Sequence, residues 1–154
     1  MKLPFLLSMI AAVAALSAAQ GAPPPDLVAM AAKARVDGQL ASSWCRGQFR
    51  EGRRNAYAVA VTSAIGGGRY LVLDGDAPVV ELAPFKGTPE VQCYTPAEAR
   101  KLDVAIRESE AISGRIVPAF ATTIVCAFVA DHNAVCWQYS PKTRTFVEVG
   151  GWQT

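Results

Sequence analysis

Four cysteines constrain the fold of this chain more than any other feature of its sequence. They stand at Cys45, Cys93, Cys126 and Cys136, and none of them forms the close C-x-x-C pair that is typical of a structural zinc site. The chain also has a single histidine, so we expect no metal site and no cofactor. An even number of cysteines in an exported chain indicates disulfides, and the sequence therefore predicts two of them.

The N-terminus indicates that the chain is exported. Lys2 precedes an apolar run over residues 3–16, and small residues follow at 17–19. This is the pattern of a cleavable signal peptide over residues 1–19, and cleavage before Ala22 is the second choice. The alternative of an uncleaved anchor is disfavoured, because the run is shorter than the roughly 20 residues that span a bilayer.

The composition of residues 20–154 fits a single exported globular domain. Hydrophobic residues make up 51% of the chain and charged residues 18%, which excludes a disordered chain. The 15 basic residues nearly balance the 13 acidic ones, so no general attraction to nucleic acid is expected. Abundant arginine and alanine favour a bacterial source and a periplasmic or secreted location. No second stretch is long and apolar enough to span a membrane after cleavage.

Two segments have helical signals. Asp26 is a predicted N-cap for an alanine-rich helix from residue 27 to about residue 40. Thr95, Pro96 and Glu98 predict a capping box that opens a second helix, which runs to about Ser109.

The rest of the chain has the alternation of strands. Residues 56–65 alternate between bulky side chains and alanines, and the smooth alanine face is the predicted seat of the first helix. Glycines 66–68 predict a hairpin to the next strand at 70–73. Further strands are expected at residues 79–82, 122–130, 135–139 and 146–149. The sequence thus predicts an α+β domain with an antiparallel sheet of about five to seven strands, two helices and stabilising disulfides.

The expected disulfides are Cys45–Cys93 and Cys126–Cys136. The second pair restricts the register of the hairpin that contains His132. A two-residue loop at His132 and Asn133 would place the two cysteines on opposite faces of the sheet. The bridge therefore requires a loop of odd length, such as residues 130–132.

No pattern in the sequence points to catalysis. His132 stands between Asp131 and Asn133 in a predicted turn, and no G-x-S-x-G motif is present. Asp74 and Asp76 lie in a glycine turn, where acids are common without any function. A pair of carboxylates from distant positions remains open as an acid/base site.

Four arginines lie within nine residues, at Arg46, Arg50, Arg53 and Arg54. The simplest interpretation is a solvated loop between strands. The functional interpretation is a contact with an acidic protein or an acidic polymer of the envelope, because guanidinium groups bind carboxylate and phosphate in a bidentate geometry.

The same segment resembles the FG-GAP type of strand–loop–strand pattern. Gly47, Phe49, Gly52 and Asn55, followed by the strand at residues 57–59, are similar to G-D-F-N-G-D-G-x-x-D-x-A. The resemblance implies a strand that enters a calcium-binding loop and a second strand that leaves it. Gln48, Arg50 and Arg53 replace the acids of the pattern, so calcium binding is not carried over.

These observations predict a non-enzymatic exported domain that binds another macromolecule in the cell envelope, as an inhibitor, immunity or accessory protein would. The alternatives are a small cell-envelope hydrolase with dispersed carboxylates and a purely structural envelope component.

We expect the exported protein to begin at Gln20, because the small residues at positions 17 and 19 form the cleavage pattern. Intact-mass measurement of protein purified from the envelope checks this. A mass that includes Met1 would contradict it.

Overall fold

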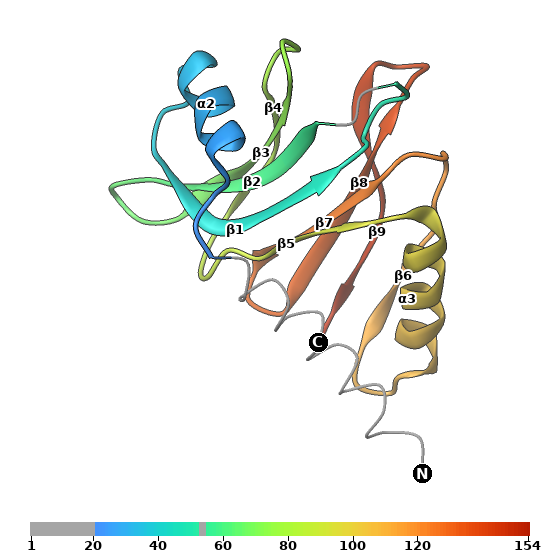
Figure 1. The fold of residues 1–154 in the computed structure, drawn as a ribbon. Helices are drawn as coiled ribbons and strands as arrows, with labels where there is room; N and C mark the ends of the chain where they lie inside the picture. The colour runs from blue at the N-terminus through green and yellow to red at the C-terminus, as the bar shows by residue number, and fades with distance from the viewer. Residues whose placement is uncertain (1–20, 53–54) are drawn as a thin grey trace.

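The computed structural model describes residues 21–52 and 55–154, and over these residues the chain forms two helices and nine strands. The α+β class, the antiparallel pairing and the disulfide stabilisation are confirmed, and the strands are divided between two sheets (Figure 1). The expected signal peptide at residues 1–19 lies outside the described residues. Within them, no helix is long and apolar enough to cross a membrane.

The first sheet has the order β1-β2-β3-β4 and the second has the order β5-β7-β8-β9-β6. Helix α2 covers the outer side of the first sheet and helix α3 covers the outer side of the second (Figure 1). The helices are α2 (Pro25–Lys33) and α3 (Pro96–Glu108); the strands are β1 (Gln39–Gly47), β2 (Ala56–Thr62), β3 (Gly68–Asp74), β4 (Val80–Phe85), β5 (Val91–Tyr94), β6 (Ser113–Ile116), β7 (Ile124–Ala130), β8 (Asn133–Ser140) and β9 (Thr145–Gln153).

The alanine face of β2 packs between the two sheets, and the prediction that it seats the first helix is wrong. Ala56, Ala58 and Ala60 belong to a core cluster with residues of β5, β7 and β8. Helix α2 instead packs Leu27 and Ala31 on the bulky face of β2, which carries Tyr57, Val59 and Val61. Short side chains let one sheet approach another as readily as they let a helix approach a sheet, and the second sheet takes this face.

Helix α2 ends at Lys33, seven residues before the predicted end. Arg35 has a left-handed backbone with φ of 54°, and residues 39–47 form strand β1 instead of continuing the helix. Gly38 marks the start of this strand rather than the end of the helix. A Cβ atom there would lie 2.7 Å from the carbonyl oxygen of Thr62 on the neighbouring strand. Strand β1 pairs with β2, whose backbone is buried and needs partners along both edges.

Helix α3 begins with the predicted capping box. The backbone N–H of Glu98 donates to Thr95 Oγ1 at 3.2 Å, and the N–H of Thr95 donates to Glu98 Oε2 at 2.9 Å. Asp103 then ties the helix to β6, accepting from the backbone N–H of Ile116 at 2.8 Å and from Arg107 and Arg115. Burial by itself raises the pKa of Asp103, but the hydrogen bond from Ile116 and the two guanidinium charges outweigh it and lower that pKa.

Both predicted disulfides are present. Cys45–Cys93 joins β1 to β5 and so connects the two sheets, whereas Cys126–Cys136 joins neighbouring strands under α3. Cys126 and Cys136 lie directly opposite each other with Cα atoms 4.0 Å apart. The hairpin reaches this register through an irregularity between Phe128 and Ala130, and not through the suggested odd-length loop. An extra residue in one strand shifts the register by one and has the same effect.

The close packing on the alanine face of β2 predicts that a larger side chain at this face lowers the stability of the fold. We expect Ala58→Leu to lower the free energy of unfolding by about 1–3 kcal/mol, because Ala58 is fully buried between the sheets. Ala64→Leu is the control, since Ala64 belongs to the same alternation over residues 56–65 but lies exposed in the β2–β3 turn. Its effect should stay within about 0.5 kcal/mol in urea unfolding. Equal effects of the two changes would contradict the two-sheet packing.

Candidate partner-binding surface

The loop that carries the arginines leaves β1 and runs over one end of the second sheet. Phe49 is fully buried, and its ring packs against that of Phe146 on β9 with centroids 6.1 Å apart. Gly47 precedes it at a point where a Cβ would lie 2.7 Å from Thr123 Cγ2 and 2.8 Å from the Phe49 ring. The structure thus gives the Gly47-x-Phe49 pattern a packing role.

Arg50 joins the two sheets at this end of the molecule. Its Nε lies 3.3 Å from Oδ2 of Asp74 at the end of β3, and its guanidinium stacks 4.6 Å from the ring centre of Tyr139 on β8. The Arg50 side chain is 21% exposed and that of Asp74 is 3% exposed. Arg50 is therefore a structural residue that anchors the loop, and it leaves little guanidinium surface for a partner.

Arg46 lies on β1, on the face of the first sheet that α2 covers. Its Nε donates to the Tyr57 hydroxyl at 3.1 Å, and that hydroxyl donates to Asp26 Oδ2 at 2.6 Å at the start of α2. Burial, together with the hydrogen bond to Asp26, raises the pKa of Tyr57. Arg46 thus faces α2, and the structure does not bring it together with Arg50. Arg53 and Arg54 lie outside the described residues.

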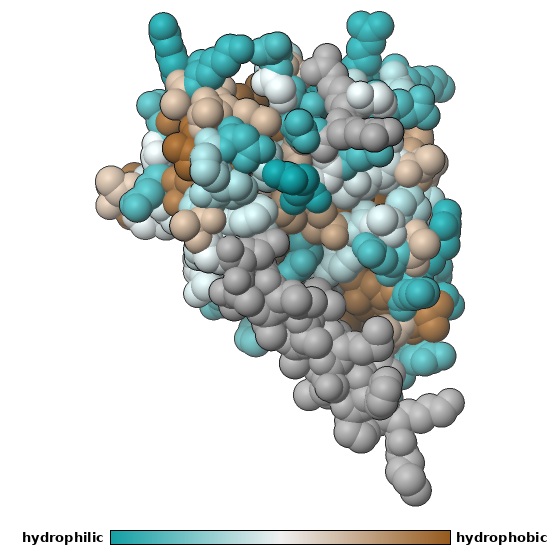
Figure 2. Space-filling view, viewed as in Figure 1, coloured by the Kyte–Doolittle hydropathy of each residue, from teal (hydrophilic) through white to brown (hydrophobic). Residues whose placement is uncertain are grey.

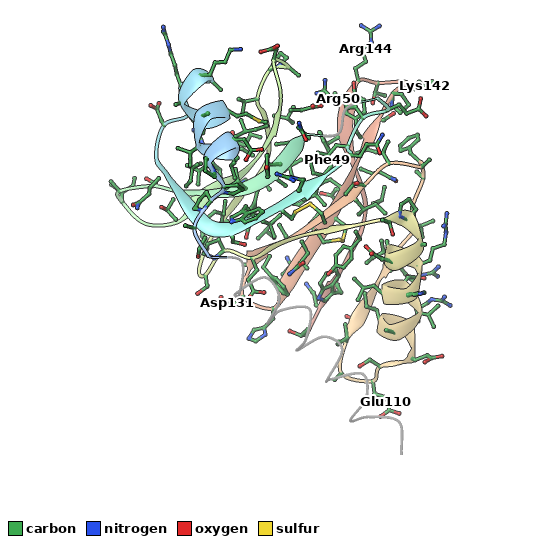
Figure 3. All side chains as sticks on the ribbon, viewed as in Figure 1. Phe49, Arg50, Glu110, Asp131, Lys142 and Arg144 are labelled. Carbon is green, nitrogen blue, oxygen red and sulfur yellow. A yellow bond between two sulfur atoms is a disulfide. The ribbon has the colours of Figure 1, made fainter. Side chains whose placement is uncertain are left out.

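Two cations that sequence reasoning missed lie at the same end as the anchored loop. Lys142 and Arg144 are exposed in the turn between β8 and β9, close to Arg50 and Phe49 (Figure 3). The side chains that project from this upper end of the molecule are hydrophilic (Figure 2). The sequence places these two residues between the predicted strands at 135–139 and 146–149, but only the contacts of Phe49 with Phe146 and of Arg50 with Tyr139 bring this turn beside the loop.

The residues with catalytic potential are spread over the molecule. His132 is exposed at the opposite end of β8, with Nδ1 3.0 Å from Thr154 Oγ1. Asp74 is the ion-pair partner of Arg50, and Asp76 pairs with Lys33 at 2.6 Å. Within the described ranges, no three His, Cys, Asp or Glu side chains gather as a metal site would require.

One open hollow of about 520 Å³ lies beside the β2–β3 turn, and Asp37, Arg69 and Glu81 are among its lining residues. Both carboxylates are exposed, and the guanidinium of Arg69 donates to the Asp37 carbonyl at 3.3 Å. Asp37 and Glu81, two carboxylates that are distant in the sequence, therefore line the same hollow.

Comparisons of the chain with protein-family models, with curated proteins and with solved structures give no match.

The anchoring role of Arg50 is open to a direct test. We expect Arg50→Ala to lower the free energy of unfolding by about 1–3 kcal/mol, because it removes the ion pair with the buried Asp74 carboxylate and the stack on Tyr139. Lys142→Ala, in the exposed turn nearby, should change it by no more than about 0.5 kcal/mol. Urea unfolding followed by tryptophan fluorescence gives both values. An Arg50→Ala protein as stable as the Lys142→Ala control would show that Arg50 is only a surface residue.

Proposed function

We propose that this chain is an exported, non-enzymatic domain that binds an acidic macromolecule in the cell envelope, as an inhibitor, immunity or accessory protein. The surface that binds consists of the β1–β2 loop and the β8–β9 turn, with Arg53, Arg54, Lys142 and Arg144 as the contacting cations. The observation that carries the proposal is the exposed pair Lys142 and Arg144 beside a loop that contains two further arginines.

The rigidity of this end supports a role in recognition. Phe49 and Arg50 hold the start of the loop against β8 and β9. A binding site on an anchored scaffold loses less conformational entropy when the partner docks. The chain as a whole is nearly neutral, so a basic end produces a local field that attracts and orients an acidic surface.

The location in the envelope rests on two features. The N-terminal pattern of Lys2, an apolar run and small residues is that of a signal peptide. The two disulfides fit an oxidising compartment such as the periplasm, where such bonds form and persist.

A second candidate function is the small cell-envelope hydrolase, and the hollow near Asp37 and Glu81 is the observation that favours it. A paired carboxylate site requires both groups, so Asp37→Asn and Glu81→Gln should each abolish any hydrolysis of envelope polymer. A purely structural role in the envelope is the remaining alternative, and this role requires neither the hollow near Asp37 and Glu81 nor the basic end.

We expect replacement of Arg53, Arg54 and Lys142 by serine to leave the fold intact and to weaken binding to the partner. The effect should be larger at low salt, because exposed charges are screened as ionic strength rises. The partner is captured from envelope extract, and its association rate with the parent and with the variant is measured by surface plasmon resonance. Arg50 stays unchanged, since its loss would disturb the fold.

The matched control replaces Arg100 and Lys101 by serine. Both are exposed on α3 and belong to neither the β1–β2 loop nor the β8–β9 turn, so their loss should not affect binding. Equal affinity and rate for the triple variant and the parent would contradict the proposed surface.

A further inference from the structure

The edge strands of the two sheets differ in how they are protected from pairing with a further strand. Strand β4 carries Pro84, which has no N–H to donate to an added strand. The Cys45–Cys93 disulfide joins β1 and β5, the edge strands of the two sheets. Strand β6 is the fourth edge, but it is only four residues long.

Because β6 is short, part of β9 is itself an edge. Strand β6 pairs with Gly150–Gln153, and Val117 N–H donates to the carbonyl of Val149 at 2.9 Å. Residues 145–148 pair with β8 on one side only. Among the residues that the structure describes, no backbone hydrogen bond reaches their other side. Figure 1 shows this part of β9 extending past β6 toward the β8–β9 turn.

The sequence of this open edge is complementary to itself. In an antiparallel pair with Phe146 opposite the partner's Phe146, Thr145 lies opposite the partner's Val147. Arg144 is the last residue of the β8–β9 turn, with φ of 57° and its N–H bonded to the carbonyl of Ser140, so only its side chain reaches toward the partner's Glu148 at the end of this pair. Ion pairs and aromatic pairs are the cross-strand contacts that stabilise antiparallel sheets. Arg144 and Glu148 are both exposed, so their side chains are accessible to a second copy.

The orientation of the side chains agrees with this pairing. Phe146 lies opposite Tyr139 of β8 and Glu148 lies opposite Trp137, so both point to the face of the second sheet that meets the first sheet. The Phe146 ring contacts Tyr139 with centroids 5.6 Å apart, so its position is held before any partner arrives. A partner copy would add its own Phe146 at the open side of this aromatic group.

We propose that the open edge of β9, centred on Phe146, pairs antiparallel with the same edge of a second copy of this chain, joining two five-stranded sheets in a two-fold symmetric dimer. The side chain of Arg144, at the end of the β8–β9 turn, then lies beside the partner's Glu148. A two-fold axis repeats each contact, so the Arg144–Glu148 pair forms twice. The edge offers few hydrogen bonds, and the dimer is therefore weak and depends on concentration. This inference does not rest on the proposed function.

A neighbouring register is the main competitor. Moving the pairing so that Thr145 lies opposite the partner's Thr145 would bring the turn residue Lys142, instead of Arg144, toward the partner's Glu148. That register offers the same number of charge contacts but separates the two Phe146 rings. The proposed register keeps the two phenyl rings together, and charge reversal at Arg144 or at Lys142 separates the two registers.

The test measures dimerisation of the mature disulfide-bonded chain by sedimentation velocity from about 10 µM to about 1 mM. We expect Glu148→Arg and Arg144→Glu each to weaken the dimer at least about tenfold, because each change converts two attractions into two repulsions. The double variant Arg144→Glu with Glu148→Arg should restore dimerisation to within about threefold of the parent. Circular dichroism melting confirms that each variant is folded.

Glu110→Arg is the matched control, because it makes the same charge change at the opposite end of the molecule (Figure 3) and should leave the dimer unchanged. A parent protein that stays monomeric at about 1 mM would overturn the proposal. Single reversals that behave like Glu110→Arg, or a double variant that fails to recover, would also overturn it. Loss of the dimer with Lys142→Glu but not with Arg144→Glu would assign the neighbouring register instead. None of these outcomes affects the capture experiment on the acidic partner, so the two proposals fail separately.

Discussion

The close contact between the alanine face of β2 and the second sheet is the constraint on which the rest of this structure depends. Ala56, Ala58 and Ala60 are fully buried and supply almost no side-chain volume. The volume comes from neighbouring strands, above all from Tyr70 and Trp137 in the same cluster. Tyr70 also donates a hydrogen bond to the carbonyl of Phe128 at 2.6 Å and accepts one from the N–H of Glu90 at 3.1 Å. Its burial raises the pKa of the phenol to about 12, so the hydroxyl keeps its proton as the donor.

This packing brings the β1–β2 loop onto the end of the second sheet. The Cys45–Cys93 disulfide joins the sheets in the middle of the fold, and Phe49 and Arg50 join them at its end. An arginine that stacks on one sheet and pairs with a buried acid of the other holds both sheets in one arrangement. The same packing places the two cations of the β8–β9 turn beside this loop. The molecule therefore has a basic end although the net charge of the chain is small.

A buried glutamine organises the opposite side of the second sheet and leaves part of β9 open. Gln138 is fully buried, and its amide group makes four hydrogen bonds to the backbone of Ala119, Phe120 and Thr122. These bonds hold the connection from β6 to β7 against the outer face of β8. The connection turns away from β9 after Val117, and no residue that the structure describes forms a backbone hydrogen bond with the open side of residues 145–148. Edges of this kind accept another strand readily.

The sequence by itself determined the features that arise from neighbours along the chain. The capping box at Thr95 depends on residues three positions apart, and the β2–β3 hairpin depends on a glycine turn. The register of the hairpin at His132 followed from two cysteines that must share a face, although the sequence did not reveal the bulge that produces it. These interactions are local, so a pattern of a few residues contains all the partners.

Only the tertiary structure decided which surface meets which. The alternation in β2 identified two apolar faces, but whether a helix or a sheet covers the alanines depends on strands more than thirty residues away. Strands β1, β5 and β6 have weak patterns of their own and exist because a neighbouring strand needs a backbone partner. Of the arginine segment, the sequence located the loop, yet it could not separate Arg50, which Asp74 and Tyr139 hold, from a cation free to meet a partner. Lys142 and Arg144 were missed for the same physical reason. Their place beside the loop is set by the packing of two sheets, and no spacing along the chain encodes that distance.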